Sequence, residues 1–117
     1  MMAWPAFAQL LEQAFKRQGY AVMRSKSAVV DFELERQGRR MVVSARRWKS
    51  ARTGLEALRA LQAEREAAEA SDALVIFLGA ISDNARPYAT ENRITLWQSG
   101  ELARALRGLP LSPAKAR

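Results

Sequence analysis

Apolar residues recur along the chain at two spacings, one typical of helices and the other of strands. From Pro5 to Gln18 they return every three or four positions, the spacing of one helix face, and Gly19 suits the position just past a helix end. From Ala28 to Glu35 apolar and polar residues alternate, which is typical of a strand with one buried face. The residues expected on that buried face are Val30, Phe32 and Leu34.

The turn Gln37-Gly38 joins this strand to a return strand over 39–48. Thr53 and Glu56 form a capping box that starts a second helix, which runs to about residue 70. The apolar run 73–78 is typical of a strand buried on both faces. Further patterns predict strands over 20–23 and 93–97 and helices over 82–90 and 99–106, the last one capped by Ser99.

The predicted order, αβββαβαβα, indicates an α/β fold in which helices flank a mixed sheet. We expect one domain over residues 1–109 and a disordered tail over 110–117. The longest apolar run, 73–81, is far shorter than the ~20 residues that span a bilayer. The N-terminus also lacks the pattern of a signal peptide. We therefore expect no membrane association and a cytoplasmic location.

The chain contains neither cysteine nor histidine. Zinc sites built from these residues and histidine-based catalysis are therefore excluded. Any metal would be held by carboxylates and water, a ligand set that suits magnesium or manganese.

The net charge of +7 is concentrated in residues 36–55, which contain seven basic residues and no acidic one. A solvated surface normally mixes both signs, so this stretch favours a phosphate-binding role over a merely soluble face. Six of the seven basic residues are arginines, which suit bidentate phosphate contacts. A helix start at Gly54 would add backbone donors for a phosphate, and Trp48 could stack on a base. The basic residues are Arg36, Arg39, Arg40, Arg46, Arg47, Lys49 and Arg52.

Pairing across Gln37-Gly38 places Asp31 opposite Ser44, with Arg46 as its diagonal neighbour and Glu33 on the same exposed face. One interpretation is an ion pair between Asp31 and Arg46 at the rim of a half-exposed sheet. The other is a carboxylate placed beside a basic group for phosphodiester chemistry. Spacing alone does not choose between them.

Several short segments, taken in their order and spacing, carry a family resemblance. They are Leu11-Glu12, Gly19-Tyr20, the Asp31 strand, VSARRW at 43–48, Gly54, VIF at 75–77, and Asn84-Ala85 before ITLWQSG at 94–100. Together they make the chain, from about Phe7 to Leu106, similar to the Mrr-like restriction endonuclease domains. The resemblance implies the restriction-endonuclease-like fold.

In that family an Asp binds the divalent metal, and a Glu or Gln followed two positions later by a catalytic Lys lies on the next strand. The resemblance places these roles on Asp31, Ser44 and Arg46, and a helix glutamate near such sites matches Glu12. Two of the three positions depart from the pattern. A serine hydroxyl is a poor substitute for a carboxylate or amide oxygen beside magnesium, and an arginine cannot act as a base near neutral pH.

The resemblance and the charge together predict a domain that binds double-stranded DNA and has an inactive or impaired nuclease site. An active Mg²⁺-dependent endonuclease, with Glu33 or Glu12 as a relocated ligand, is one alternative. A protein-interaction module on a retired nuclease scaffold is another. The resemblance also leaves a homodimer open.

Overall fold

The computed structural model describes residues 4–25, 27, 29–45, 52–77 and 79–108. Its elements are α1 (Trp4–Arg17), β1 (Ala21–Arg24), β2 (Phe32–Arg36), β3 (Arg39–Ala45), β4 (Arg52–Thr53), α2 (Leu55–Ala67), β5 (Asp72–Ile76), β6 (Ala80–Ile81), α3 (Ala85–Glu91), β7 (Ile94–Trp97) and α4 (Ser99–Leu106). Apart from the short β4 and β6, this is the predicted order of elements.

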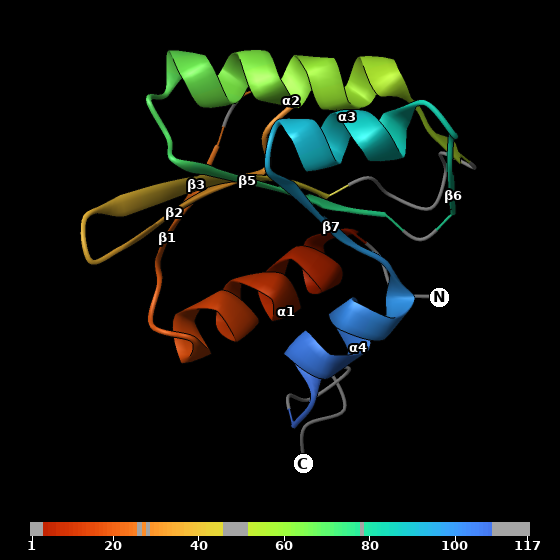
Figure 1. The fold of residues 1–117 in the computed structure, drawn as a ribbon. Coiled ribbons are helices and arrows are strands. Elements are labelled where there is room, and N and C mark those ends of the chain that lie inside the picture. The colour runs from red at the N-terminus through yellow and green to blue at the C-terminus, as the bar shows by residue number, and fades with distance from the viewer. Residues whose placement is uncertain (1–3, 26, 28, 46–51, 78, 109–117) are drawn as a thin grey trace.

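A five-stranded sheet with the order β1-β2-β3-β5-β7 forms the middle layer (Figure 1). The first three strands are an antiparallel meander, and β5 and β7 join β3 in parallel through the crossovers that contain α2 and α3. The predicted mixed α/β sheet is therefore confirmed. The unpredicted strands β4 and β6 pair with each other as a separate parallel ribbon. They have two residues each, too few to leave a periodic pattern in the sequence.

Helices α1 and α4 cover one face of the sheet, and α2 and α3 cover the other (Figure 1). The core between the sheet and the α1–α4 layer contains Phe15, Phe32 and Leu34, and the core under α2 and α3 contains Val42, Leu58 and Val75. The central strand β3 contributes to both cores. No helix in the described part of the chain is long and apolar enough to cross a membrane.

The β2–β3 hairpin has the predicted register over most of its length, with Arg36 opposite Arg39 and Phe32 opposite Val43. Its two turn residues, Gln37 and Gly38, both have positive φ angles, +55° and +82°. Two positive φ angles match the twist of the flanking strands, as in the favoured two-residue hairpin turns. The polar Gln37 adopts the conformation for which Asn or Gly is the more usual choice.

The register changes at the start of β2, where Asp31 and Phe32 both lie opposite Val43. The Asp31 N–H donates to the Val43 carbonyl at 2.8 Å, although Val43 is the register partner of Phe32. Two residues opposite one is the arrangement of a β-bulge, and the extra residue reverses the alternation of side chains. The prediction that Val30 shares a face with Phe32 is therefore wrong. Val30 is buried instead in the core under α2 and α3.

Two helix starts also differ from prediction. Thr53 belongs to β4, so Gly54 takes the N-cap position of α2 without a side-chain hydrogen bond. Ser99 is the first residue of α4 rather than its cap. Gln98 is the N-cap and forms a capping box with Glu101, whose pKa is lowered because its carboxylate accepts the Gln98 backbone N–H.

Candidate functional site

Asp31 lies at the start of β2, beside the end of β3, and its side chain completes the backbone hydrogen bonding there. Its Oδ2 accepts the Ala45 N–H at 2.7 Å. In an unbulged ladder that donor would face the Val30 carbonyl, which the bulge has moved away. Asp31 is half-buried, and its own carbonyl accepts the Ser25 N–H at 3.0 Å. The carboxylate is therefore fixed by the backbone of the neighbouring strand.

The hairpin pattern predicts Ser44 on an exposed face, and this prediction is wrong. It is a buried polar residue, 6% exposed, on the face of β3 that α2 and α3 cover. Its Cα register partner on the next strand is Val75. The prediction failed because β3 is a central strand, and the helices that bury its polar-looking face follow later in the sequence. Arg46 lies outside the described residues, so its predicted pairing with Asp31 stays a prediction.

Glu12 projects from α1 and forms two ion pairs. Its carboxylate lies 3.1 Å from Lys16 Nζ and 3.2 Å from Arg24 Nε. The hydrogen bond from Lys16, followed by the contacts with Arg24, holds the pKa of Glu12 below its ordinary value of 4.5. Arg24 is the β1 partner of Phe32, the residue after Asp31, so the fold brings Glu12 to the same end of β2 as Asp31. Both of its oxygens are already engaged by cations.

Glu33 is half-buried in the middle of β2, between Met23 of β1 and Val42 of β3. Because the bulge lies between them, Glu33 and Asp31 do not share a face of the sheet as strict alternation would predict. Among the described residues, no group of three Asp, Glu, His or Cys side chains could hold a metal ion.

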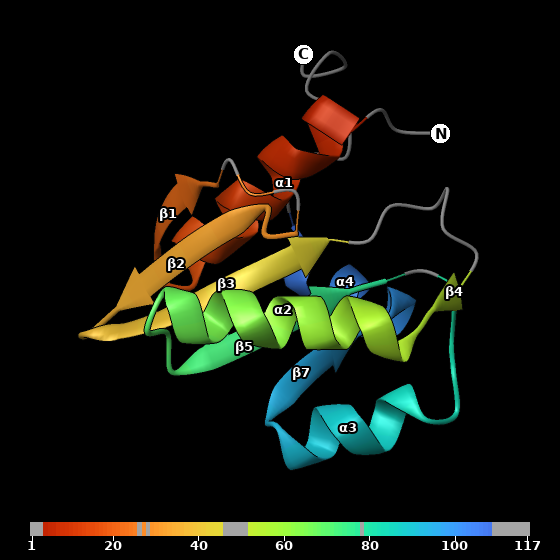
Figure 2. The same ribbon diagram turned by 90° about the horizontal axis from the view of Figure 1, so that it is seen from above.

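The basic residues of the hairpin turn lie at the other end of β2 from Asp31. Arg36 lies five positions after Asp31 along extended chain, which corresponds to roughly 16 Å. Figure 2 shows the hairpin turn at one end of the sheet, with β4 and the start of α2 near the other. The predicted binding residues are therefore divided. Arg36, Arg39 and Arg40 lie at the turn, Arg52 and Gly54 lie at the end near Asp31, and Arg46, Arg47, Trp48 and Lys49 lie outside the described residues.

Each arginine of the turn contacts a group from a different element. The Arg36 guanidinium donates to the Gln18 carbonyl at 2.7 Å and lies 4.2 Å from the centre of the Tyr20 ring. Arg39 pairs with Asp72 at 3.1 Å.

Arg40 donates to the Ala68 carbonyl at 3.1 Å, just past the end of α2. The basic stretch itself contains no acid, but the fold supplies Asp72 from a strand 33 residues further along the chain. No sequence signal marked Gln18, Tyr20 or Asp72 as neighbours of these arginines, because these contacts depend on the tertiary fold.

Comparison with known structures shows the same fold in larger proteins. The crystal structure of a protein of unknown function, AF1548, superimposes with a TM-score of 0.66 at 16% identity, over 80% of this chain and 56% of that one. EndoMS in its apo form gives a TM-score of 0.57 at 15% identity, over 78% and 44% of the two chains. The MspJI restriction endonuclease in complex with a 27-mer oligonucleotide gives 0.51 at 14%, over 93% and 29%. This chain thus spans about half or less of the length of these structures.

No curated protein matches the chain in sequence. A family model does match, however. The model of the Mrr catalytic domain, described as a restriction endonuclease, covers residues 1–106, nearly the whole region in which the fold is described. The chain belongs to this restriction endonuclease family.

Proposed function

We propose that this chain is a double-stranded-DNA-binding domain with an inactive or impaired nuclease site. The observation that carries the proposal is the environment of Asp31 and Ser44. The resemblance assigns the role of metal-binding carboxylate to Asp31, and one oxygen of this side chain accepts the Ala45 N–H. It assigns the second ligand to Ser44, which is only 6% exposed.

Restriction endonucleases typically use Mg²⁺, so the described residues can be tested against that ion. Mg²⁺ requires a near-octahedral set of oxygen ligands and is usually held by one or two carboxylates together with water. Ser44 offers a neutral hydroxyl on a short side chain, and Glu12 is neutralised by Lys16 and Arg24. Glu33 is separated from Asp31 by the bulge. The described residues do not fit the ion, and we derive no cleavage step through it.

DNA binding is supported by family membership and by the charge of residues 36–55. Phosphate contacts from arginine, lysine and helix N-termini dominate non-specific DNA binding. The fold places the three arginines of the turn at one end of the sheet and Arg52 of β4 near the other, so one end carries most of the contacts with a short duplex. We favour the end near Asp31, where Arg52 and Gly54 lie, because Asp72 pairs with Arg39 and brings a negative charge to the turn.

The first experiment measures the binding of a fully paired duplex over a range of salt concentrations. If about four phosphates are neutralised, the logarithm of the affinity falls with the logarithm of salt concentration at a slope near −3 to −4. Arg52→Gln should reduce the slope by about one unit. Arg59→Gln, which changes an exposed arginine on the outer face of α2, is the matched control. A flat salt response would reject the DNA-binding proposal and favour a protein-interaction module, in which case nucleic acid should not copurify.

The second experiment incubates the protein with plasmid DNA and Mg²⁺ or Mn²⁺. We expect no cleavage by the unmodified chain. The double variant Ser44→Gln with Arg46→Lys restores the family pattern, and any cleavage it gains would show that the rest of the site is intact. Cleavage by the unmodified chain that disappears in Asp31→Asn, a variant that keeps an oxygen for the Ala45 N–H, would overturn the proposed inactivity. Multi-angle light scattering of the same preparation shows whether the chain is a monomer or a homodimer.

A further inference from the structure

A cavity lies between the end of α1 and the sheet, on the side of the hairpin turn and away from Asp31. Its volume is about 380 Å³, within the range of small-molecule sites. Its walls come from the end of α1, the following loop, the hairpin turn and the three parallel strands, β3, β5 and β7.

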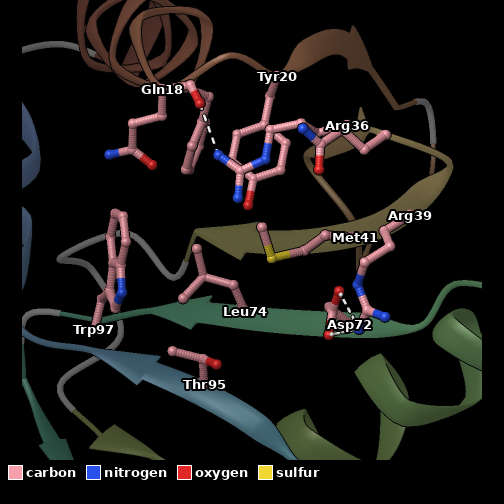
Figure 3. A pocket seen from close by; sticks show the side chains of 11 residues that line it. Gln18, Tyr20, Arg36, Arg39, Met41, Asp72, Leu74, Thr95 and Trp97 are labelled. Atoms are coloured by element: carbon pink, nitrogen blue, oxygen red, sulfur yellow. Dashed lines mark hydrogen bonds and ion pairs between the residues drawn. The ribbon is translucent and has the colours of Figure 1, made fainter.

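The floor and one end of the cavity are apolar and aromatic. Met41 and Leu74 form the floor, and the Trp97 indole stands at one end (Figure 3). Trp97 stacks on Phe15 with ring centroids 5.9 Å apart and remains partly exposed. The Phe15 contact packs Trp97 against the core, and its partial exposure inside the cavity also offers a surface on which a flat ring can stack. Stacking on an aromatic side chain is a common way of binding nucleobases.

The opposite end and the roof of the cavity are polar. Figure 3 shows the Arg39–Asp72 pair at the end away from Trp97, and Tyr20 and Arg36 above the floor. Arg36 is ordered by the Gln18 carbonyl and the Tyr20 ring, neither of which neutralises its charge. No ion pair found among the described residues includes Arg36. The Arg36 guanidinium is therefore an ordered cation at the roof, suited to one phosphate group.

We infer that this cavity binds a single nucleotide, with the base on the Trp97 end of the floor and the phosphate on Arg36. Asp72, which already accepts from Arg39, and the exposed Thr95 hydroxyl are the polar groups that can meet the edge of a base. The nucleotide can come from two sources. It is either a free nucleoside monophosphate or an unpaired nucleotide displaced from a DNA duplex. This inference concerns a site separate from Asp31 and does not depend on duplex binding.

Isothermal titration with deoxyadenosine monophosphate tests the free source. Thr95→Glu places a longer, anionic side chain at the cavity from an exposed strand position, so it should weaken binding by about tenfold or more. Thr90→Glu adds the same charge at an exposed position of α3, on the other face of the sheet from the cavity, and is the matched control. Arg36→Gln should also weaken binding by about tenfold, with Arg59→Gln as its control. Thermal unfolding of each variant checks that the fold is retained.

A duplex with one unpaired nucleotide, compared with the fully paired duplex, tests the second source. A Thr95→Glu effect on the monophosphate supports the free nucleotide, and an effect confined to the unpaired duplex supports the displaced one. The inference is overturned if neither probe binds saturably, or if Thr95→Glu and Thr90→Glu have equal effects. Binding of the paired duplex, which Thr95→Glu should leave unchanged, reports separately on the proposed function.

Discussion

Replacing Asp31 by alanine should destabilise the fold, although the family resemblance assigns Asp31 to an active-site position. Removal of a carboxylate from a catalytic cluster often stabilises a protein, because such sites are strained or self-repelling. Here the Asp31 carboxylate accepts the N–H of Ala45, a residue that is 7% exposed, at 2.7 Å. Alanine would leave that buried donor without its acceptor.

The expected cost follows from this one hydrogen bond. A hydrogen bond to a charged group contributes about 1.5–3 kcal/mol. For a chain of this size, such a loss lowers the midpoint of thermal unfolding by roughly 5–15 °C. Asp31→Asn keeps a side-chain oxygen but loses the charge, so its cost should be about half that of Asp31→Ala.

Urea unfolding at neutral pH, followed by circular dichroism, measures these free energies. Asp83→Ala, which removes an exposed loop carboxylate before α3, is the matched control and should change stability by less than about 0.5 kcal/mol. If Asp31→Ala were as stable as Asp83→Ala, the assignment of Asp31 as the acceptor for the end of β3 would be wrong.

Three further substitutions test other parts of the fold. The pKa of Glu12 is lowered, so its contacts with Lys16 and Arg24 stabilise the fold above pH 4.5 and lose this effect as the pH falls through the folded-state pKa. The unmodified chain should therefore be more stable than Glu12→Gln at pH 7, by less than about 1 kcal/mol. Urea titrations at pH 7 and pH 3 should show this difference shrinking at the lower pH. Gln62 Nε2 donates to Glu66 at 3.2 Å, but its buried Oε1 has no hydrogen-bond partner among the described residues, so Gln62→Met should raise the unfolding free energy by about 1 kcal/mol. A loss of stability would show that Oε1 is satisfied. Gly19 has φ +96°, so Gly19→Ala should lower the midpoint of thermal unfolding, at a cost of about 1 kcal/mol or more, and an unchanged midpoint would contradict the assigned backbone conformation.

The sequence predicted the element order and the hairpin register because both depend on local patterns. Alternation identified β2, a continuous apolar run identified β5, and Gln37-Gly38 fixed which residues pair. The same patterns failed where a tertiary contact decides the outcome. The bulge at Asp31 places Val30 on the opposite face of the sheet from the predicted one. The alternation of apolar and polar residues gives no sign of one extra residue at the start of a strand.

The candidate site was predicted less well than the fold. The resemblance assigned the site to Asp31, Ser44 and Arg46, which stays a prediction, and it gave no sign that helices from later in the chain bury Ser44. The basic stretch looked like one surface because its residues are neighbours in sequence. Strand β3 starts at Arg39 and carries the chain to the opposite end of the sheet before β4 begins at Arg52, so Arg39 and Arg52 lie near different ends of the sheet.

The contacts of the hairpin turn have a consequence for the entropy of binding. An isolated two-stranded hairpin is only marginally stable in water, and a free arginine side chain carries about 2 kcal/mol of rotamer entropy. Here Arg36 is held against the end of α1, and Arg40 is held against the end of α2 on the other side of the sheet. Much of the conformational freedom of these side chains is lost during folding, before any partner arrives. A ligand that meets these guanidinium groups meets them already ordered, so its affinity is reduced less by the immobilisation of flexible side chains.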